Sequence, residues 1–392
     1  MPIRPRLFTE PAGSYFLLGP RGTGKSSLLK ARHPQSLYFD LLDAETEREL
    51  LARPERLRQR VAAAPPHLPV IIDEVQRVPA LLDAVHALIE QDHRTFILSG
   101  SSARKLRRGG TNLLGGRAAL RTLAPYVAAE LGAQFNLSHA LQFGLIPLVV
   151  EAAHPGDVLR SYAGLYVREE VRAEALVRNH GDFARFLEVA AFSHGAELNL
   201  SALARECDIT RRTAEGYLGV IEDLLLGVRL PVFARRATRV LTAHPKFYYF
   251  DTGLYRSLRP AGPLDRPEEI AGPALEGLVF QHLRAWIAAH PDHSLHFWRT
   301  RSGVEVDFVI YGPTEFVAIE VKHSARRRSA DLSPLRTFAS DYPEARIALL
   351  DRAKHREIEH GVACMPVEDF LRQLQPEGPL ADALSLRGEL AS

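Results

Sequence analysis

One short segment near the start of the chain restricts its fold and chemistry more than any other. Residues 19–26 read Gly-Pro-Arg-Gly-Thr-Gly-Lys-Ser and fit the pattern G-x-x-x-x-G-K-[ST] of a phosphate-binding loop. An apolar segment at 14–19 precedes the loop, and a helix-like segment at 24–32 follows it. Glycines let backbone N–H groups wrap phosphates, and the following helix N-terminus adds positive potential. The pattern predicts a nucleotide site; a glycine turn that fits by chance is the alternative.

The residue types inside this loop predict separate roles. We expect Lys25 to reach the β- and γ-phosphates of ATP and Ser26 to ligate Mg²⁺. Further contacts to the nucleotide are expected from Gly19, Pro20, Arg21, Gly22, Thr23, Gly24 and Ser27. Lysine is rare here, with six among 49 basic residues: Lys25, Lys30, Lys105, Lys246, Lys322 and Lys354. A lysine in such a chain indicates a need for its compact charge, which arginine does not replace in a tight site.

Two further apolar segments end in polar residues that a parallel sheet would bring beside the loop. Asp73 and Glu74 close the first segment, where Asp73 is expected to hold Mg²⁺ through water and Glu74 to polarise the attacking water. The alternative is a charged strand end that caps the next helix. Ser99 and Ser101 lie at the end of the second segment. They either sense the γ-phosphate or simply terminate the strand.

Arg117 follows two glycines in the segment NLLGGR. An arginine on such a tip reaches the nucleotide of a neighbouring subunit in some ATPases. This reading predicts a homo-oligomer, with a ring among the arrangements. Because arginine is abundant in this chain, a solvated side chain is the alternative.

The segments GPRGTGKSS, IIDEVQRVP, SGSSA and LLGGR, in this order, resemble a compact AAA+ ATPase family of the AAA_14 type. Its members typically carry a second conserved region called DUF4143. The resemblance covers nearly the whole chain, and it implies ATP and Mg²⁺ as cofactors and ATP hydrolysis as the activity. The positions that match the family are Lys25 and Ser26 (Walker A), Asp73 and Glu74 (Walker B), Ser99 or Ser101 (sensor), and Arg117 (finger-like arginine).

The order of elements predicts an α/β fold with several parts. Strands alternate with helices in the first third of the chain, which indicates a parallel sheet. The parts expected are a P-loop AAA+ core at 1–131, a helical lid at 132–195, a winged-helix-like unit at 196–258, a Pro/Gly-rich linker at 259–273, an α/β restriction-endonuclease-like domain at 274–372, and a tail at 373–392.

Residues 198–226 have the spacing of a helix-turn-helix. Ser201 is expected to cap the first helix and Thr210 the second. DNA contacts are expected from the start of the second helix, at Arg211, Arg212 and Thr213. The alternative is a unit that only packs against its neighbours.

A hairpin is predicted at residues 304–323, where two apolar segments flank a four-residue loop. If Tyr311 pairs with Phe316, Asp307 lies opposite Glu320 and Glu305 opposite Lys322. With a strand period of two, these charges share one face with Val309 and Ala318, while Val306 and Phe308 lie on the other.

The acid–acid–lysine set resembles the PD-(D/E)xK nuclease motif, with Val306 in place of the proline. The resemblance implies Mg²⁺ or Mn²⁺ at Asp307 and Glu320, Lys322 as the residue that orients water or stabilises charge, and Glu276 as the preceding acid. We expect nucleic-acid contacts from Trp298, Arg299 and His323. The alternatives are a Glu305–Lys322 salt bridge beside solvated acids, and a fold that binds without cutting.

Two functions follow from these sites. The first is a DNA-associated AAA+ ATPase with a nuclease-like domain, in which ATP turnover remodels or translocates DNA or gates cleavage; a defence role is a variant of it. The second is a regulatory or scaffold ATPase whose C-terminal domain recognises a partner. With two cysteines, no disulfide framework or four-cysteine zinc site is expected. No apolar run approaches the roughly 18 residues of a membrane span, which predicts no membrane partner and a cytoplasmic location.

Overall fold

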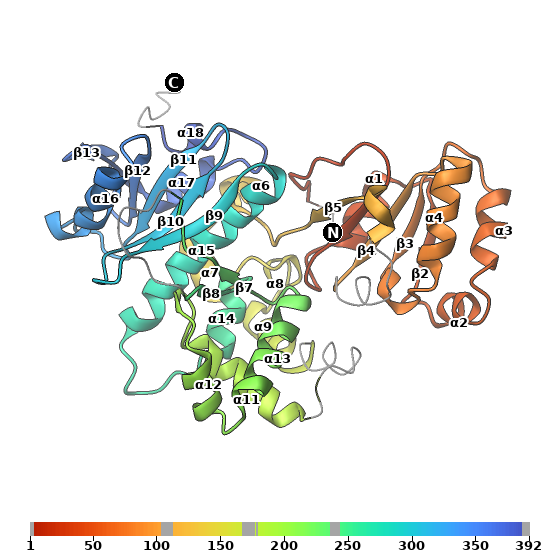
Figure 1. The fold of residues 1–392 in the computed structure, drawn as a ribbon, viewed down its shortest axis with the longest axis horizontal. Coiled ribbons are helices and arrows are strands. Elements are labelled where there is room, and N and C mark those ends of the chain that lie inside the picture. Colours follow the sequence, from red (N-terminus) through yellow and green to blue (C-terminus); the bar gives the residue numbers. More distant parts are fainter. Residues whose placement is uncertain (1–3, 103–112, 167–176, 178, 236–243, 386–392) are drawn as a thin grey trace. The chain divides into compact units, whose positions relative to one another are not determined.

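The computed structural model describes residues 4–102, 113–166, 177, 179–235 and 244–385 of the 392-residue chain. Contacts between Cα atoms divide it into two compact units, shown in Figure 1. Unit 1 comprises Met1–Ala124 and Asp223–Leu225, and unit 2 comprises Pro125–Glu222 and Leu226–Ser392. Residues 167–176, part of the expected helical lid, lie outside the described residues.

Unit 1 is built on a parallel five-stranded sheet, which confirms the predicted α/β fold. Its strands are β1 (Tyr15–Leu18), β2 (Leu37–Asp40), β3 (Val70–Asp73), β4 (Phe96–Gly100) and β5 (Ala119–Thr122). The strand order is β2-β3-β4-β1-β5, and every pair in it is parallel. Ligands bind parallel sheets outside the carboxyl ends of the strands. This order places the end of β4 between the ends of β1 and β3.

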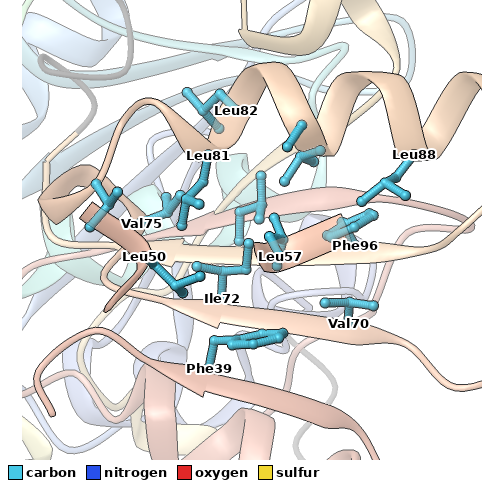
Figure 2. Close-up of a cluster of buried hydrophobic side chains, with 14 of the residues drawn as sticks. Phe39, Leu50, Leu57, Val70, Ile72, Val75, Leu81, Leu82, Leu88 and Phe96 are labelled. Atoms are coloured by element: carbon cyan, nitrogen blue, oxygen red, sulfur yellow. The ribbon is translucent and has the colours of Figure 1, made fainter. Parts of the chain in front are cut away.

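Helices cover the sheet of unit 1 through apolar side chains. They are α1 (Lys25–Arg32), α2 (Ala44–Ala52), α3 (Arg56–Ala63) and α4 (Leu81–Asp92), with 3₁₀ turns η1 (Val75–Arg77) and η2 (Leu113–Gly116). Figure 2 shows Leu81, Leu82 and Leu88 of α4 above Val70 and Ile72 of β3. Residues in this cluster are nearly or fully buried. The apolar stripe of α4 therefore fixes the turn that follows β3.

Unit 2 begins with short helices, as predicted for residues 132–195. They are α6 (Ala128–Leu131), η3 (Gly132–Gln134), α7 (Leu137–Phe143), α8 (Pro147–Val150), α9 (Pro155–Ser161), the π-helical turn η4 (Tyr162–Tyr166) and α11 (His180–Ala191). A small antiparallel sheet of order β6-β8-β7 follows, made of β6 (Ala196–Glu197), β7 (Gly227–Leu230) and β8 (Lys246–Tyr249).

The predicted helix-turn-helix lies between β6 and β7. Its helices are α12 (Leu200–Glu206) and α13 (Arg211–Asp223). The expected cap of the first helix was wrong by two residues, because the Asn199 side chain accepts the hydrogen bond from the Ala202 N–H at 3.0 Å. The second cap is confirmed, since the Thr210 hydroxyl accepts from the Thr213 N–H at 3.1 Å.

The C-terminal part of unit 2 is a mixed six-stranded sheet of order β13-β14-β12-β11-β10-β9. Its strands are β9 (Ser294–Arg299), β10 (Glu305–Tyr311), β11 (Phe316–Val321), β12 (Arg346–Asp351), β13 (Glu357–Glu359) and β14 (Val362–Pro366). Helix α16 (Ser329–Asp341) packs Leu332, Leu335 and Phe338 against one apolar cluster of the sheet. Phe280 of α15 stacks near Phe308 of β10, with 6.2 Å between ring centroids.

Two segments of unit 2 differ from the sequence prediction, the expected linker at 259–273 and the expected tail at 373–392. Helix α15 runs from Pro267 to Ala289 and includes part of the segment expected as a linker, because Pro267 at the first helical turn favours a helix start. Helix α14 (Thr252–Leu258) precedes it. In the expected tail, α18 (Leu380–Ala383) follows α17 (Val367–Gln373) and buries Leu380 completely. Residues 386–392 lie outside the described part.

The described helices include none that is both long and apolar enough to cross a membrane.

Candidate functional site

The phosphate-binding loop connects β1 to α1, as the sequence predicts. Gly22 and Gly24 have φ angles of 77° and 87°, a region that glycine adopts without strain. Gly24 is the N-cap of α1, so the N–H groups of the first helical turn face the loop. At Gly19 a Cβ would lie 2.6 Å from the Leu123 carbonyl oxygen, so this position has room only for glycine.

Lys25 is buried and turned toward its own loop. Its ammonium donates to the carbonyl oxygens of Gly19 at 2.8 Å and Pro20 at 3.3 Å. The Thr23 hydroxyl also donates to Pro20, at 2.8 Å. Carbonyl oxygens are neutral acceptors, and phosphate oxygens would compete for the ammonium through stronger charge-assisted hydrogen bonds.

Arg6 is a loop contact that the sequence analysis missed. Its guanidinium donates to the carbonyl oxygens of Thr23 and Ala124, each at 2.7 Å. Arg6 therefore ties the segment before β1 to the end of the phosphate loop. In a chain so rich in arginine, no local pattern distinguished this residue.

Asp73 lies at the end of β3 beside β4, as expected for a Walker B acid. Its carboxylate accepts from the Tyr38 hydroxyl at 2.5 Å and from the Ser99 hydroxyl. Burial, and next the adjacent Asp73 carboxylate, raise the pKa of Tyr38 above its usual value. The Tyr38 hydroxyl also interacts with Ser26, so one tyrosine joins the two expected Mg²⁺ residues. Hydroxyl and carboxylate oxygens suit Mg²⁺, so the donor set fits this ion.

Glu74 is held by two side chains at the ends of neighbouring elements. It has a φ of 59° and is 5% exposed. Its carboxylate accepts from the Gln76 amide and from the Ser101 hydroxyl at 3.3 Å, and Gln76 donates to Ser101 at 3.0 Å. The sequence analysis missed Gln76, although it stands two residues after the acid pair. A Cβ at Gly100 would lie 2.6 Å from the Gln76 Oε1 atom, so glycine there makes room for the amide.

Arg117 lies at the end of η2 and forms an ion pair with Glu90 of α4. Its side chain is 36% exposed. A role at a neighbouring subunit's nucleotide would require Arg117 to exchange this partner. The role of Arg117 at a neighbouring subunit's nucleotide therefore stays a prediction.

The three predicted DNA-contact residues begin α13. Arg211 and Arg212 are exposed, and Thr213 is half-buried. The opposite side of α13 is apolar, with Ala214, Tyr217 and Leu218 buried. The helix thus presents its first turn and its two arginines outward.

A second site forms in unit 2, where the predicted acids meet a lysine that the prediction left out. The Lys246 ammonium lies 2.9 Å from Glu276, 2.5 Å from Glu305 and 3.1 Å from Asp307. Its side chain is 1% exposed. The Tyr248 hydroxyl donates to Glu276 at 2.5 Å. We call Lys246, Glu276, Glu305, Asp307, Glu320 and Lys322 the carboxylate centre. Lys246 is the member of this centre that the sequence prediction missed. The sequence contained one indication of it, because Lys246 is one of six lysines and begins an aromatic strand.

The predicted hairpin register is confirmed from Phe308 to Tyr311, but the face predicted for Val306 is wrong. Tyr311 pairs with Phe316, and Phe308 with Ile319. A β-bulge between Val306 and Val309 shifts β10 against β9, because an extra residue interrupts the alternation of side chains. Val306 therefore joins the cluster of Val309 under α16, while Phe308 faces Phe280 of α15.

The second half of the centre lies on β11. The Asp307 carboxylate accepts from the Val321 N–H at 2.9 Å, which ties β10 to β11 at the acids. Glu320 forms an ion pair with Lys322, and its second oxygen is buried with no hydrogen-bond partner among the described residues. Burial, and next the Asp307 carboxylate, raise the pKa of Glu320 well above its usual range. The same causes raise the pKa of Glu276 to about 7.

Two further predictions at this site need correction. The alternative salt bridge between Glu305 and Lys322 does not form, because Glu305 pairs with Lys246 and with Arg299 at 2.9 Å. Trp298 is 1% exposed and packs edge-on against Phe338, so its ring belongs to the core and is closed to nucleic acid. His323 lies 3.2 Å from the Arg352 guanidinium.

The donor set of the carboxylate centre does not fit the expected Mg²⁺ or Mn²⁺. Within the described ranges, no group of three or more His, Cys, Asp or Glu side chains is arranged to hold a metal ion. The Lys246 ammonium already stands as a cation among three of the four carboxylates.

The loop, the two acids and the order of the strands define a P-loop nucleotide-binding domain. Residues 12–132 match the family AAA_14, described as an AAA domain. Residues 134–265 match a domain of unknown function, DUF8612, and residues 271–370 match a second one, DUF4143. The first third of the chain is therefore an AAA domain, which points to an ATPase in general and implies nucleotide binding. The DUF4143 region expected from the resemblance is confirmed.

No curated protein matches the chain. The crystal structure of protein VC1899 from Vibrio cholerae matches at 12% identity and a TM-score of 0.22, covering 92% of this chain and 96% of that chain. A TM-score this low carries no argument about fold or function.

Proposed function

We propose that this chain hydrolyses ATP at the phosphate loop of unit 1, with Mg²⁺ as the metal. The observation that carries the proposal is the placement of Lys25 after β1 and of Asp73 and Glu74 at the end of β3, the two parallel strands that flank β4. Bound Mg²⁺ would neutralise charge on the phosphates. Ser26 and Asp73 are the residues that would hold it. Lys25 binds the β- and γ-phosphates, and Glu74 takes the proton of the attacking water, with Gln76 and Ser101 fixing its carboxylate.

Nucleotide binding is tested by comparing two lysines of the same helix. Lys25 is buried at the loop, whereas Lys30 is largely exposed and pairs with Asp40 at 3.7 Å. We expect Lys25→Ala to weaken Mg²⁺-ATP binding by at least about 100-fold, the scale of a buried charge-assisted contact. Lys30→Ala should bind within about twofold of wild type. Equal affinity in all three proteins would refute the phosphate site.

Arg117 would act on the nucleotide of a neighbouring copy in a homo-oligomer. Mixing two inactive variants tests this. A subunit with Lys25→Ala still offers Arg117, and a subunit with Arg117→Ala still binds ATP. Turnover that returns on mixing supports action between copies, and two variants that stay inactive together oppose it. Glu90→Ala, which removes the ion-pair partner of Arg117 and leaves Arg117 in place, is the control.

DNA action is a second candidate, favoured by the exposed arginines that begin α13. The order α11-β6-α12-α13-β7-β8, with an antiparallel sheet, supports a winged-helix unit around them. A helix-turn-helix inserts its second helix, here α13, into the major groove. The test is ATP turnover with and without duplex, forked and single-stranded DNA, in wild type and in Arg211→Ala/Arg212→Ala. Stimulation that the double variant loses supports the candidate, and turnover indifferent to every DNA opposes it.

The grouping of Asp307, Glu320 and Lys322 supports a nuclease-like arrangement of the C-terminal sheet. The ammonium of Lys246, 3.1 Å from Asp307, favours a module that binds a partner without cutting. The chain would then be a regulatory ATPase, with the C-terminal sheet as its recognition part. Incubating the protein with supercoiled plasmid and Mg²⁺ or Mn²⁺ distinguishes a nuclease from a partner-binding module. Nicking that Asp307→Ala abolishes would establish a nuclease.

A further inference from the structure

The carboxylate centre holds a cation that the chain itself supplies. An ammonium has three N–H donors, and carboxylates of Glu276, Glu305 and Asp307 lie within 3.1 Å of the Lys246 nitrogen. The Phe297 ring lies beneath the same nitrogen, with its centroid at 5.7 Å. Every donor thus has an acceptor, and the Lys246 side chain itself is 1% exposed. Buried charges persist in proteins when they are paired and hydrogen-bonded in this way.

Three of the four carboxylate oxygens of Asp307 and Glu320 are already engaged, and the fourth, on Glu320, is buried with no hydrogen-bond partner among the described residues. One oxygen of Asp307 accepts from Lys246, and the other accepts from the Val321 N–H at 2.9 Å. One oxygen of Glu320 pairs with Lys322. A divalent ion at Asp307 would therefore lie close to a buried ammonium of the same sign. Like charges at short range in a buried site repel strongly.

The position of Lys246 in the fold gives this cation a structural consequence. Lys246 begins β8, the central strand of the small sheet beside the helix-turn-helix. Glu276 lies on α15, and Glu305 and Asp307 lie on β10 of the C-terminal sheet. One side chain thus connects β8 to α15 and to β10, through acids that lie 30 and 61 residues away in sequence. The same strand reaches Glu276 again through Tyr248.

We propose that Lys246 is the permanent cation of the carboxylate centre, which locks β8 of the helix-turn-helix region to the C-terminal sheet and uses no divalent metal. Glu276 and Asp307, two acids of the nuclease-like motif, supply negative charge that holds Lys246 in place. The inference concerns the recognition part of the proposed regulatory ATPase and is independent of ATP hydrolysis. A reaction of water on a metal has no place in the centre while Lys246 occupies it.

Manganese binding to the full-length chain tests the inference directly. Mn²⁺ is the probe, and bound Mn²⁺ is counted by electron paramagnetic resonance without nucleotide. We expect wild type and Asp307→Asn to bind the same number of ions. In Lys246→Met, whose unbranched side chain is one atom shorter and carries no charge, we expect one additional ion that the further change Asp307→Asn removes. One more ion in wild type than in Asp307→Asn would overturn the proposal.

Thermal unfolding supplies a second measurement that does not count ions. A ligand that binds only the folded state raises Tm. Lys246→Met leaves three carboxylates without their cation, so its Tm should fall, and Mn²⁺ should restore part of the loss. Wild type should show the same Tm shift with Mn²⁺ as Asp307→Asn. A larger shift in wild type would contradict the proposal even if Lys246→Met fails to fold. Lys25→Ala should leave all these results unchanged, which separates them from any failure at the ATP site.

Discussion

At the scale of single residues, the placement of Glu74, the acid that we assign to the attacking water, depends on its neighbours. Glu74 adopts a left-handed backbone conformation that few non-glycine residues take, and such strain persists where surrounding contacts hold it. Gln76 and Ser101 provide these contacts through their hydrogen bonds to the carboxylate. A general base works only within hydrogen-bond reach of its proton, so the placement of Glu74 matters as much as its charge.

Replacing Gln76 tests that placement. In Gln76→Ala we expect kcat for ATP to fall at least about tenfold, since positioned acid–base groups contribute roughly 10²–10⁴-fold to rates. The affinity for Mg²⁺-ATP should stay within about twofold, because Gln76 contacts the base and not the phosphate loop. Gln91→Ala, an exposed glutamine on α4, is the control. An unchanged kcat in Gln76→Ala would show that Glu74 needs no such support.

His282 makes unit 2 sensitive to acid. Its Nε2 accepts from the Ala128 N–H at 2.9 Å, and its Nδ1 lies 2.8 Å from the Leu278 carbonyl oxygen. Burial lowers its pKa from 6.5 to about 4. The unfolded chain therefore takes up the proton first as pH falls. Stability from the neutral ring is present above pH 6.5 and is lost progressively between 6.5 and 4.

This linkage predicts a pH-dependent difference between wild type and His282→Gln. Between pH 7.5 and 4.5, wild type should lose ~2 kcal/mol more of its free energy of unfolding than the variant. The amide keeps an acceptor for Ala128 but does not titrate. Urea unfolding of unit 2 at the two pH values measures the difference. Equal losses in both proteins would mean that His282 titrates normally in the folded state.

At the scale of elements, α14 is held against α7 by a close approach of backbones. A Cβ on Gly253 would collide with the carbonyl group of Phe143. Asp251 caps α14 by accepting from the N–H groups of Gly253 and Leu254, and it also accepts from the Leu145 N–H at 2.7 Å. The cap and the glycine together fix the distance between the two helices.

Two glycine-to-alanine changes in helices should therefore have opposite effects. Gly253→Ala should destabilise unit 2 by ~2 kcal/mol or more, because overpacking against backbone forces the helices apart. Gly216 of α13 has nothing within 4 Å of an added Cβ, so Gly216→Ala should stabilise by ~0.5–1 kcal/mol. The urea midpoints of the two variants, each compared with wild type, measure both changes in stability. A stable Gly253→Ala protein would show that α14 and α7 separate freely.

The elements also show what sequence reasoning reached and what it could not reach. The loop at 19–26 and the acid pair at 73–74 were predictable because each ends an apolar strand of a parallel sheet. The register of the hairpin followed from its short loop. The bulge in β10 has no signature in a pattern of period two, so the face predicted for Val306 came out wrong. The contact of Lys246 with Asp307 joins residues 61 positions apart, and no local pattern specifies such a pair.

At the scale of the whole molecule, the chain joins an AAA domain to two regions of unknown function. Unit 1 contains the phosphate loop and the acid pair, where we propose that ATP is hydrolysed. Unit 2 contains a helix-turn-helix and a carboxylate centre connected through Lys246. In the function that we propose, ATP turnover in unit 1 serves recognition by unit 2.

The most direct test of ATP hydrolysis is phosphate release at saturating Mg²⁺-ATP, measured for wild type and Glu74→Gln with binding recorded in parallel. The amide keeps the shape of the side chain but cannot take a proton. We predict that Glu74→Gln binds Mg²⁺-ATP within about threefold of wild type while kcat falls at least about 100-fold. Phosphate release at the wild-type rate in Glu74→Gln would contradict the assignment of the catalytic site.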